Sequence, residues 1–345
     1  MKKYIVILNA AKNLLLPVLT LLCLSLSCKR IPLYDPETDV FLKLDLQLRS
    51  NVELDDNFGD IDPNSSLGEK VYGKIPSTVQ VLFYNSLNHE LVSEDFLPIE
   101  GGFINVPAGT YDLIVYGMGM EATQVAGLET RGGAYSFTSQ TDSKVKISKV
   151  SDDPNAEPGT RAVEEYNVIY EPDHIYVARK EGVVIPVHAN IDQTVVIEAE
   201  MTPLLDTYTF EVLNVEGAER VRKADVYITG QAPARYLWDG RYPGKPCAIY
   251  FQAEADAALG HINTVFNTFG KLSEAQSTVY LNVAVTDSEG GKYQWIYDVT
   301  DQFDNPDNTR HHIVISDPIV IPSGGGSGFT TSVNGWDVDI TEIDM

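Results

Sequence analysis

The sequence predicts an all-β fold of two sandwich domains, on three observations. Short runs rich in Val, Ile, Thr, Tyr and Phe recur along the chain, separated by clusters of Gly, Pro, Asn and Asp. No long segment has the apolar period of a helix, and "EGAERVRKA" is the best candidate for one short helix or turn. The length of 345 residues suits about two domains, and 43% hydrophobic residues can fill their cores.

The chain begins with an export signal that ends at a cysteine. "MKK" supplies positive charge, and the apolar stretch behind it is short for a spanning helix, which needs about 20 residues. Cys28, preceded by Ser27, resembles the lipobox of bacterial lipoproteins, although Ser25 stands where that box prefers Leu. We therefore expect residues 1–27 to be a lipoprotein signal peptide and Cys28 to carry lipid on its sulfur. A secreted protein with a cysteine near its cleavage site is the alternative.

The first strand of the mature chain is expected in "VFLKLDLQL", residues 40–48. Leu42, Leu44 and Leu46 share one face, while Lys43 and Asp45 lie on the other, which is the two-residue period of a half-buried strand. Further strands of the first domain are expected within 77–85, 103–119, 134–139, 164–171, 173–179, 182–189 and 194–201. Those of the second domain are expected within 207–217, 223–230, 247–255, 278–287, 292–300 and 311–322, with "DSEGGKY" as a hairpin connection.

Polar segments and one proline divide the chain. Residues 54–70 and 151–161 are rich in Pro, Gly and Asp and are predicted to be loops. Pro203 interrupts a strand pattern that then restarts, which indicates a crossover between domains. We therefore expect an N-terminal sandwich over 28–202 and a C-terminal sandwich over 203–322.

The tail, residues 323–345, combines a tether with one more strand. "SGGGSG" is flexible by composition. In the following "WDVDITEI", Trp336, Val338 and Ile340 alternate with Asp337 and Asp339, which again indicates a half-buried strand.

Sequence signatures of catalysis and metal binding were sought and not found. The net charge of −24 argues against nucleic acid as a partner. The sequence holds no zinc-type Cys pairs, HExxH, P-loop, GxSxG or dinucleotide fingerprint. His311 and His312 would point to opposite faces of a strand, and the acidic "DVTDQFDNPDNTR" lacks the EF-hand order of ligands. We expect no metal, no cofactor and no catalytic residue. A carboxylate pair for glycoside hydrolysis stays open, because the spacing of acids in space is not readable from sequence.

Cys247 is the one cysteine left once the signal is removed and Cys28 carries lipid, so no intrachain disulfide is expected. It lies in the strand-like "KPCAIYFQAEA" and is predicted to be a small core residue rather than a nucleophile.

Aromatic residues gather in one Gly- and Pro-rich loop, "PARYLWDGRYPGK". Tyr236, Trp238 and Tyr242 are candidates for a platform on which a sugar stacks. The alternative, which we favour, is that these rings pin the loop to the sandwich.

Several motifs occur together in a fixed order. The lipoprotein start at Cys28 is followed by "VPAGTYDLIVYG", the crossover at Pro203, "VTDQF" with "HHIVI" after it, and the terminal "GGGSGF" with "GWDVDITEI". In this order the mature chain resembles the fimbrillin superfamily, the type V pilins and pilus-associated lipoproteins of Gram-negative anaerobes. Within it, the chain is most similar to fimbrillin-related lipoproteins defined only as a domain of unknown function.

The resemblance implies two transthyretin-like β-sandwiches and assembly by strand exchange. In stalk pilins an arginine-specific protease removes the first strand, and a strand from another subunit fills the groove. By this resemblance "VFLKLDLQL" is the removable strand, Arg49 the processing site, and Trp336, Val338 and Ile340 the plug residues of the donor. An ordinary loop arginine and a tail that pairs within its own domain are the alternatives.

The expected protein is therefore a non-enzymatic outer-membrane lipoprotein of a Gram-negative bacterium, a fimbria-like structural or anchor subunit that serves adhesion. Its expected partners are other pilin-like subunits or copies of itself, membrane lipid through Cys28, and a host or glycan ligand. A surface glycan-binding lipoprotein is the alternative, and an enzyme ranks third. The cell surface is the expected location, with the periplasmic face left open.

Overall fold

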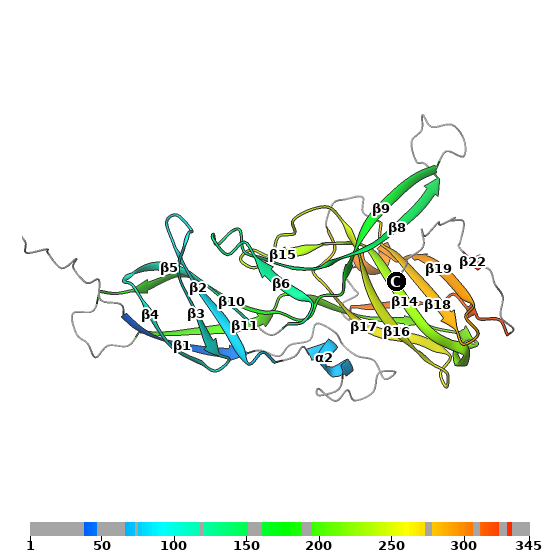
Figure 1. The fold of residues 1–345 in the computed structure, drawn as a ribbon, viewed down its shortest axis with the longest axis horizontal. Coiled ribbons are helices and arrows are strands. Elements are labelled where there is room, and N and C mark those ends of the chain that lie inside the picture. The colour runs from blue at the N-terminus through cyan, green and yellow to red at the C-terminus, as the bar shows by residue number, and fades with distance from the viewer. Residues whose placement is uncertain are drawn as a thin grey trace, which may run out of the picture.

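The computed structural model describes residues 38–46, 66–72, 75–117, 120–150, 161–187, 195–272, 278–305, 311–323 and 330–332. Within these ranges strands dominate, which confirms the predicted all-β fold (Figure 1). Among the described helices, none has the length and apolar character needed to cross a membrane. The predicted lipidation site Cys28, the candidate processing site Arg49 and the donor residues Trp336, Val338 and Ile340 lie outside the described residues.

The first sheet has seven strands in the order β3-β2-β5-β10-β11-β1-β4. Their bounds are β1 (Thr38–Leu46), β2 (Thr78–Asn85), β3 (Leu91–Pro98), β4 (Gly101–Val106), β5 (Gly109–Gly117), β10 (Tyr176–Ile185) and β11 (Val195–Pro203). β10 meets β11 only at Tyr176 and Val177, so the sheet opens into two layers beyond that corner. Leu42, Phe83 and Met201, from three of these strands, share the core between the layers.

Strand β2 is buried on both faces, which the alternation of Val79, Val81 and Phe83 did not predict. These three side chains lie in the core of the first sheet, as expected from their shared face. Leu82 and Tyr84 point the other way, into a second and larger core. The second core is therefore shared between the first sheet and the rest of the molecule.

The second sheet has ten strands, with the main order β20-β12-β17-β16-β14-β18-β19-β22. Their bounds are β12 (Asp206–Val212), β14 (Val221–Gln231), β16 (Cys247–Asp256), β17 (His261–Thr268), β18 (Tyr280–Asp287), β19 (Lys292–Asp298), β20 (His312–Ile315) and β22 (Thr330–Ser332). The connection predicted in "DSEGGKY" is confirmed, because β18 and β19 pair antiparallel across it. A short pair, β13 (Val215–Glu216) with β21 (Ile319–Val320), lies beside this sheet.

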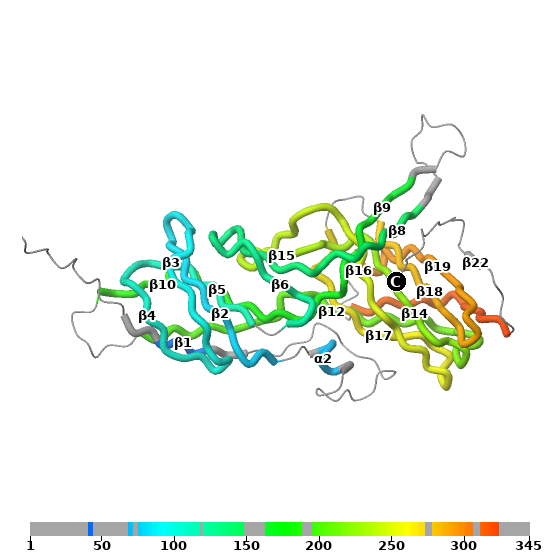
Figure 2. The backbone as a smooth tube through the Cα atoms, viewed as in Figure 1, coloured from blue at the N-terminus to red at the C-terminus, as the bar shows by residue number. Residues whose placement is uncertain are grey.

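Strands from the first half of the sequence complete the second half. β8 (Gln140–Val150) and β9 (Arg161–Tyr170) form a hairpin whose β9 pairs with β16, and the hairpin projects away from the body (Figure 1). β6 (Thr123–Ala126) and β7 (Tyr135–Thr138) form a small sheet with β15 (Ala234–Tyr236). Figure 2 traces this path from the first sheet through β6 and across to β8 and β9. The division into 28–202 and 203–322 stays a prediction, and strand pairing crosses it at these two places.

Helices are short. α2 (Ser66–Tyr72) begins inside the segment predicted to be a loop over 54–70, so that prediction is wrong for its last residues. The physical reason is Val71, which is fully buried and gives the turn an apolar anchor. The 3₁₀ turn η1 (Ala218–Arg220) confirms the short helix expected in "EGAERVRKA". α3 (Thr300–Asp304) lies within the acidic segment "DVTDQFDNPDNTR".

Candidate functional site

Strand β1 sits in a slot between two strands that are distant from it in sequence. It pairs in parallel with β11, from Val40 opposite Val195 to Leu46 opposite Met201. On its other side it pairs antiparallel with β4. A strand in this position satisfies the backbone groups of both neighbours at once, so its removal would leave two unpaired edges facing each other.

At Phe41, Leu42 and Lys43, whose side chains are described, β1 alternates as the sequence predicted. Leu42 has no exposed surface and lies in the core of the first sheet. Phe41 points outward and packs on Phe103 of β4, with ring centroids 4.9 Å apart. Lys43 also points outward, and its Nζ lies 3.0 Å from Oε1 of Glu198 in an exposed ion pair that adds little stability.

The floor of the slot is apolar. Ile104 of β4 and Ile197 and Met201 of β11 are buried around Leu42. Two unpaired edges above an apolar floor are what a donated strand with alternating apolar side chains can fill. The slot is therefore a candidate site for strand exchange.

Helix α2, the next described element after β1, is held by a different part of the molecule. Lys70 Nζ donates to Oε2 of Glu171 at 3.1 Å, and the Lys70 carbonyl oxygen lies 2.7 Å from Nε2 of His174. Lys70 Nζ also reaches the carbonyl oxygen of Val265 on β17. Because α2 docks without using β1, a chain break between the two elements would free β1 and leave α2 in place.

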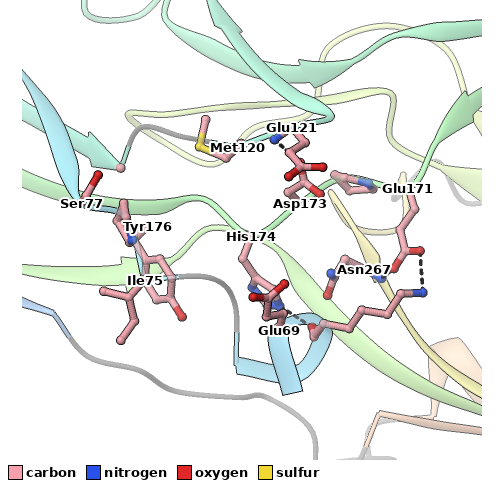
Figure 3. A pocket seen from close by; sticks show the side chains of 14 residues that line it. Glu69, Ile75, Ser77, Met120, Glu121, Glu171, Asp173, His174, Tyr176 and Asn267 are labelled. Carbon is pink, nitrogen blue, oxygen red and sulfur yellow. Dashed lines mark hydrogen bonds and ion pairs between the residues drawn. The ribbon is translucent and has the colours of Figure 1, made fainter. Parts of the chain in front are cut away.

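A cavity of about 470 Å³ lies beside α2 (Figure 3). Burial raises the pKa of Glu171, against the opposing effect of Lys70, and the same carboxylate accepts the N–H of Asn267 at 3.0 Å. Burial lowers the pKa of His174, which favours the neutral ring that donates to the Lys70 carbonyl. Asp173 accepts the N–H of Glu121 at 2.7 Å. Nδ1 of His174 is buried without a partner, but the other polar groups bond to neighbouring residues, and these contacts join α2 to the rest of the molecule.

The aromatic loop has one arginine over each of its three candidate rings. The guanidinium of Arg131 lies 4.2 Å from the centroid of Trp238. Arg241 lies 5.0 Å from Tyr236 and Arg235 lies 5.4 Å from Tyr242. Trp238 and Tyr242 also pack against the larger core. The rings are half-buried, and each has an arginine over it. This geometry fits rings that hold the loop against the sandwich better than rings that form one open surface for a sugar.

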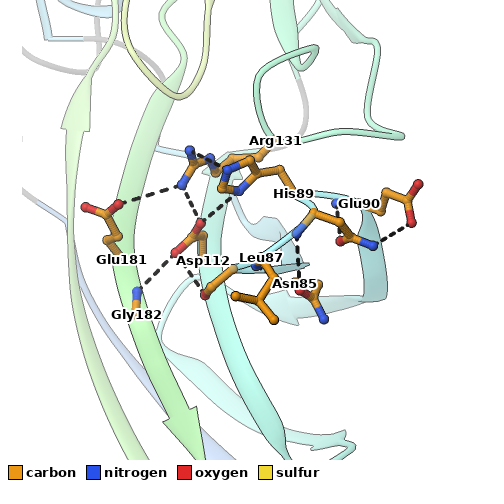
Figure 4. Close-up of polar contacts among 10 residues, drawn as sticks. Asn85, Leu87, His89, Glu90, Asp112, Arg131, Glu181 and Gly182 are labelled. Atoms are coloured by element: carbon orange, nitrogen blue, oxygen red, sulfur yellow. Dashed lines mark hydrogen bonds and ion pairs between the residues drawn. The ribbon is translucent and has the colours of Figure 1, made fainter.

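A buried carboxylate that sequence reasoning missed holds this region together (Figure 4). Asp112 of β5 accepts a hydrogen bond from Nη1 of Arg131, the N–H of Gly182 at 3.1 Å and the hydroxyl of Ser86 at 3.2 Å. Nδ1 of His89 lies 3.5 Å from the same carboxylate. The cluster ties two loops and the irregular part of β10 to β5. The signal available in the sequence is the single acid within the apolar run "TYDLIVYG".

His311 and His312 contact different residues, although only His312 belongs to strand β20 and His311 precedes it with a φ of 53°. His311 Nδ1 lies 3.1 Å from the carbonyl oxygen of Thr207. His312 Nε2 lies 3.6 Å from buried Glu211, whose other oxygen lies 2.9 Å from Nδ1 of His261. In the described part of the chain, no group of three His, Cys, Asp or Glu side chains is placed to hold a metal ion.

Cys247 is buried, with 3% of its surface exposed, and its thiol donates to the carbonyl oxygen of Gln231 at 3.3 Å. Burial raises the pKa of the thiol to about 12. The thiol therefore stays protonated at neutral pH and belongs to the larger core, as the sequence predicted.

The start of the tail lies along the edge of the second sheet. β22 pairs in parallel with β19, with Thr330 opposite Tyr293 and Ser332 opposite Trp295. The tether over 324–329 and the candidate donor strand lie outside the described residues.

Comparison with known proteins gives one family and a shared fold. The model of a domain of unknown function, DUF5119, matches residues 69–252. Among curated proteins none matches the chain. A crystal structure described as a candidate adhesin from Bacteroides ovatus has a TM-score of 0.51 at 18% identity, covering 83% of this chain and 95% of that one. This similarity shows that the fold is shared.

Two further structures are similar at lower scores. Candidate polysaccharide-binding proteins from Bacteroides thetaiotaomicron give a TM-score of 0.46 at 9% identity, covering 82% of this chain and 92% of that one. The fimbrial anchor protein Mfa2 from Porphyromonas gingivalis gives 0.46 at 13% identity, covering 81% and 90%. At these scores the similarities carry no argument about function.

Proposed function

The chain belongs to the DUF5119 family, a domain of unknown function, and we propose that it is a non-enzymatic, fimbria-like surface lipoprotein. It serves as a structural or anchor subunit in adhesion, and it joins neighbouring subunits by exchanging strands. The observation that carries this proposal is the position of β1. This strand lies between β4 and β11 in the first sheet and pairs with both.

The slot has the physical properties that strand exchange requires. Backbone groups of β4 and β11 both turn toward β1, and Leu42 fills an apolar floor beneath it. An incoming strand would gain the same hydrogen bonds and bury the same kind of side chain. The shared fold with the Bacteroides ovatus structure, which is described as a candidate adhesin, supports an adhesive role.

In this proposal the ends of the chain supply the membrane anchor, the cleavage site and the donor strand. Lipid on Cys28 anchors the exported chain in the outer membrane. Cleavage after Arg49 then separates β1 from α2, which stays docked through Lys70 and Glu171. The tail of a neighbouring subunit brings Trp336, Val338 and Ile340 into the emptied slot.

Two forms of the protein test the exchange directly. A chain that starts at Ser50 should bind a synthetic peptide of residues 334–345, while the chain that starts at Lys29 should not, because its own β1 fills the slot. A peptide with Ser in place of Trp336, Val338 and Ile340 is the matched control and should not bind. Equal binding to both chains, or none to the shorter chain, would contradict donor exchange.

The mass of the native N-terminus distinguishes the two subunit roles. A lipidated Cys28 in every molecule indicates an anchor that keeps β1. A new N-terminus at Ser50 indicates a processed stalk subunit. Any other mature start would remove Arg49 as the processing site.

A further inference from the structure

A second, polar cavity of about 250 Å³ opens where the chain crosses from the first sheet to the second. Arg179 of β10 lines one side, and Asp206 at the start of β12 lines another. Arg235, Trp238 and Asp239, from β15 and the loop after it, complete the wall. The cavity touches the end of β11 at Pro203, but none of the side chains around Leu42 in the strand-exchange slot lines it.

The two arginines of this cavity have hydrogen-bond donors that the described residues do not use. Arg179 donates from Nε to the carbonyl oxygen of Leu237, and its two terminal nitrogens find no hydrogen-bond acceptor in the described part of the chain. Arg235 donates from Nη1 to the carbonyl oxygen of Leu204, while its Nε is buried without a partner and out of reach of a ligand. The terminal nitrogens of Arg179 are not buried in this way, so a ligand that supplies oxygens can accept hydrogen bonds from them.

Positive charge in the cavity is only partly balanced. Burial lowers the pKa of Arg179, and the nearby charge of Arg235 lowers it further. Asp206 lies 3.6 Å from Arg235, and Asp239 is bound at 2.5 Å to Arg241 outside the cavity wall. In a chain with a net charge of −24, two adjacent guanidinium groups with free donors are a local exception.

We propose that this cavity binds a sugar acid, with its carboxylate held by Arg179 and Arg235. Planar guanidinium groups bind carboxylates through paired hydrogen bonds. The carboxylates of Asp206 and Asp239, which line the same cavity, accept hydrogen bonds from sugar hydroxyls. Donors and acceptors together fit a hydroxylated acid, whereas an acidic peptide side chain needs the donors alone. The proposal goes beyond strand exchange and does not depend on it.

Calorimetry on the full mature chain tests the site with named probes. Glucuronic and galacturonic acid should bind, while glucose and galactose should bind at least about tenfold more weakly, because they lack the charged group. Acetate and a glutamate-containing peptide, which carry a carboxylate without a sugar ring, are measured for comparison. Binding of either as tightly as the uronic acids would overturn the assignment to a saccharide. Failure of both uronic acids to bind would overturn the site itself.

One substitution and a matched control locate the binding. Arg179→Gln should weaken uronic acid binding about tenfold or more, because it removes a charge-assisted hydrogen bond. Lys245→Gln removes the same charge from an exposed position in the loop between β15 and β16 and should leave the affinity unchanged. A thermal melt of each variant verifies that the fold is intact. Equal losses in the two variants would show that only the overall charge matters and would contradict the proposal.

Discussion

The side-chain amide of Gln302 pairs with the backbone of Val314 as a neighbouring strand would. Its Nε2 donates to the Val314 carbonyl oxygen at 2.9 Å, and the Val314 N–H donates to its Oε1 at 2.8 Å. Val314 lies on β20, the outer strand of the second sheet, which is paired on its other side with β12. An open strand edge invites pairing with another chain, and here one glutamine occupies it. The β20 edge of the second sheet is thus paired at Val314 by a side chain.

We predict that Gln302→Ala opens this edge and promotes self-association. The loss of two hydrogen bonds should lower the free energy of unfolding by about 1–3 kcal/mol. The unpaired backbone of β20 should then favour dimers at high concentration, measured by sedimentation. Asp301→Ala, at an exposed neighbouring position of α3, is the control and should stay monomeric. A monomeric Gln302→Ala variant would show that something other than this amide protects the edge.

The two faces of β1 should respond differently to substitution. Leu42→Ala removes a fully buried side chain and should lower the free energy of unfolding by about 2–5 kcal/mol. Phe41→Ala removes an outward ring that packs on Phe103, and it should cost about 1 kcal/mol. Chemical denaturation of both variants measures the difference. Equal costs would mean that β1 is not seated as the structure shows.

The alternation of β1 was predictable because one face meets a core and the other meets solvent. Leu42 inside and Lys43 outside follow from that period alone. The same rule gave Val79, Val81 and Phe83 a common face, but it did not explain Leu82 and Tyr84. Those two are buried because a second layer covers that face of β2. The sequence of one strand does not show which other part of the chain will cover it.

The contacts between distant segments could not be predicted from sequence. β8, "QTDSKVKISKV", is too polar to be recognised as a strand. It pairs with β9, and β9 pairs in turn with β16, which is distant in sequence. The Arg179 and Arg235 cavity was missed for the same reason, since 56 positions separate the two residues in the numbering. Local patterns predicted many of the strands but not β3, β8 or β17, whereas the partners of each strand depend on the whole chain.

Asp112 should be among the most sensitive polar positions of the first sheet. Asp112→Asn leaves Arg131 without its buried counter-charge and should cost about 3 kcal/mol of stability. Glu181→Gln is a matched control, because Glu181 lies 3.8 Å from the same guanidinium but is exposed, and it should cost about 0.5 kcal/mol or less. Urea denaturation of the two variants measures both losses of stability. A large loss in Glu181→Gln would place the anchoring charge at the surface instead.

The thiol of Cys247 should resist alkylation in the folded protein. Its pKa is raised to about 12 by burial, so the reactive thiolate makes up only about one thiol in ten thousand at pH 8. In a chain that starts at Lys29, Cys247 is the one cysteine, and mass spectrometry after iodoacetamide treatment reads it directly. Labelling should be negligible at pH 8, should rise with pH because more thiolate forms, and should become complete in denaturant. Rapid labelling of the folded chain at pH 8 would mean an accessible thiolate and would reopen a nucleophilic role for this residue.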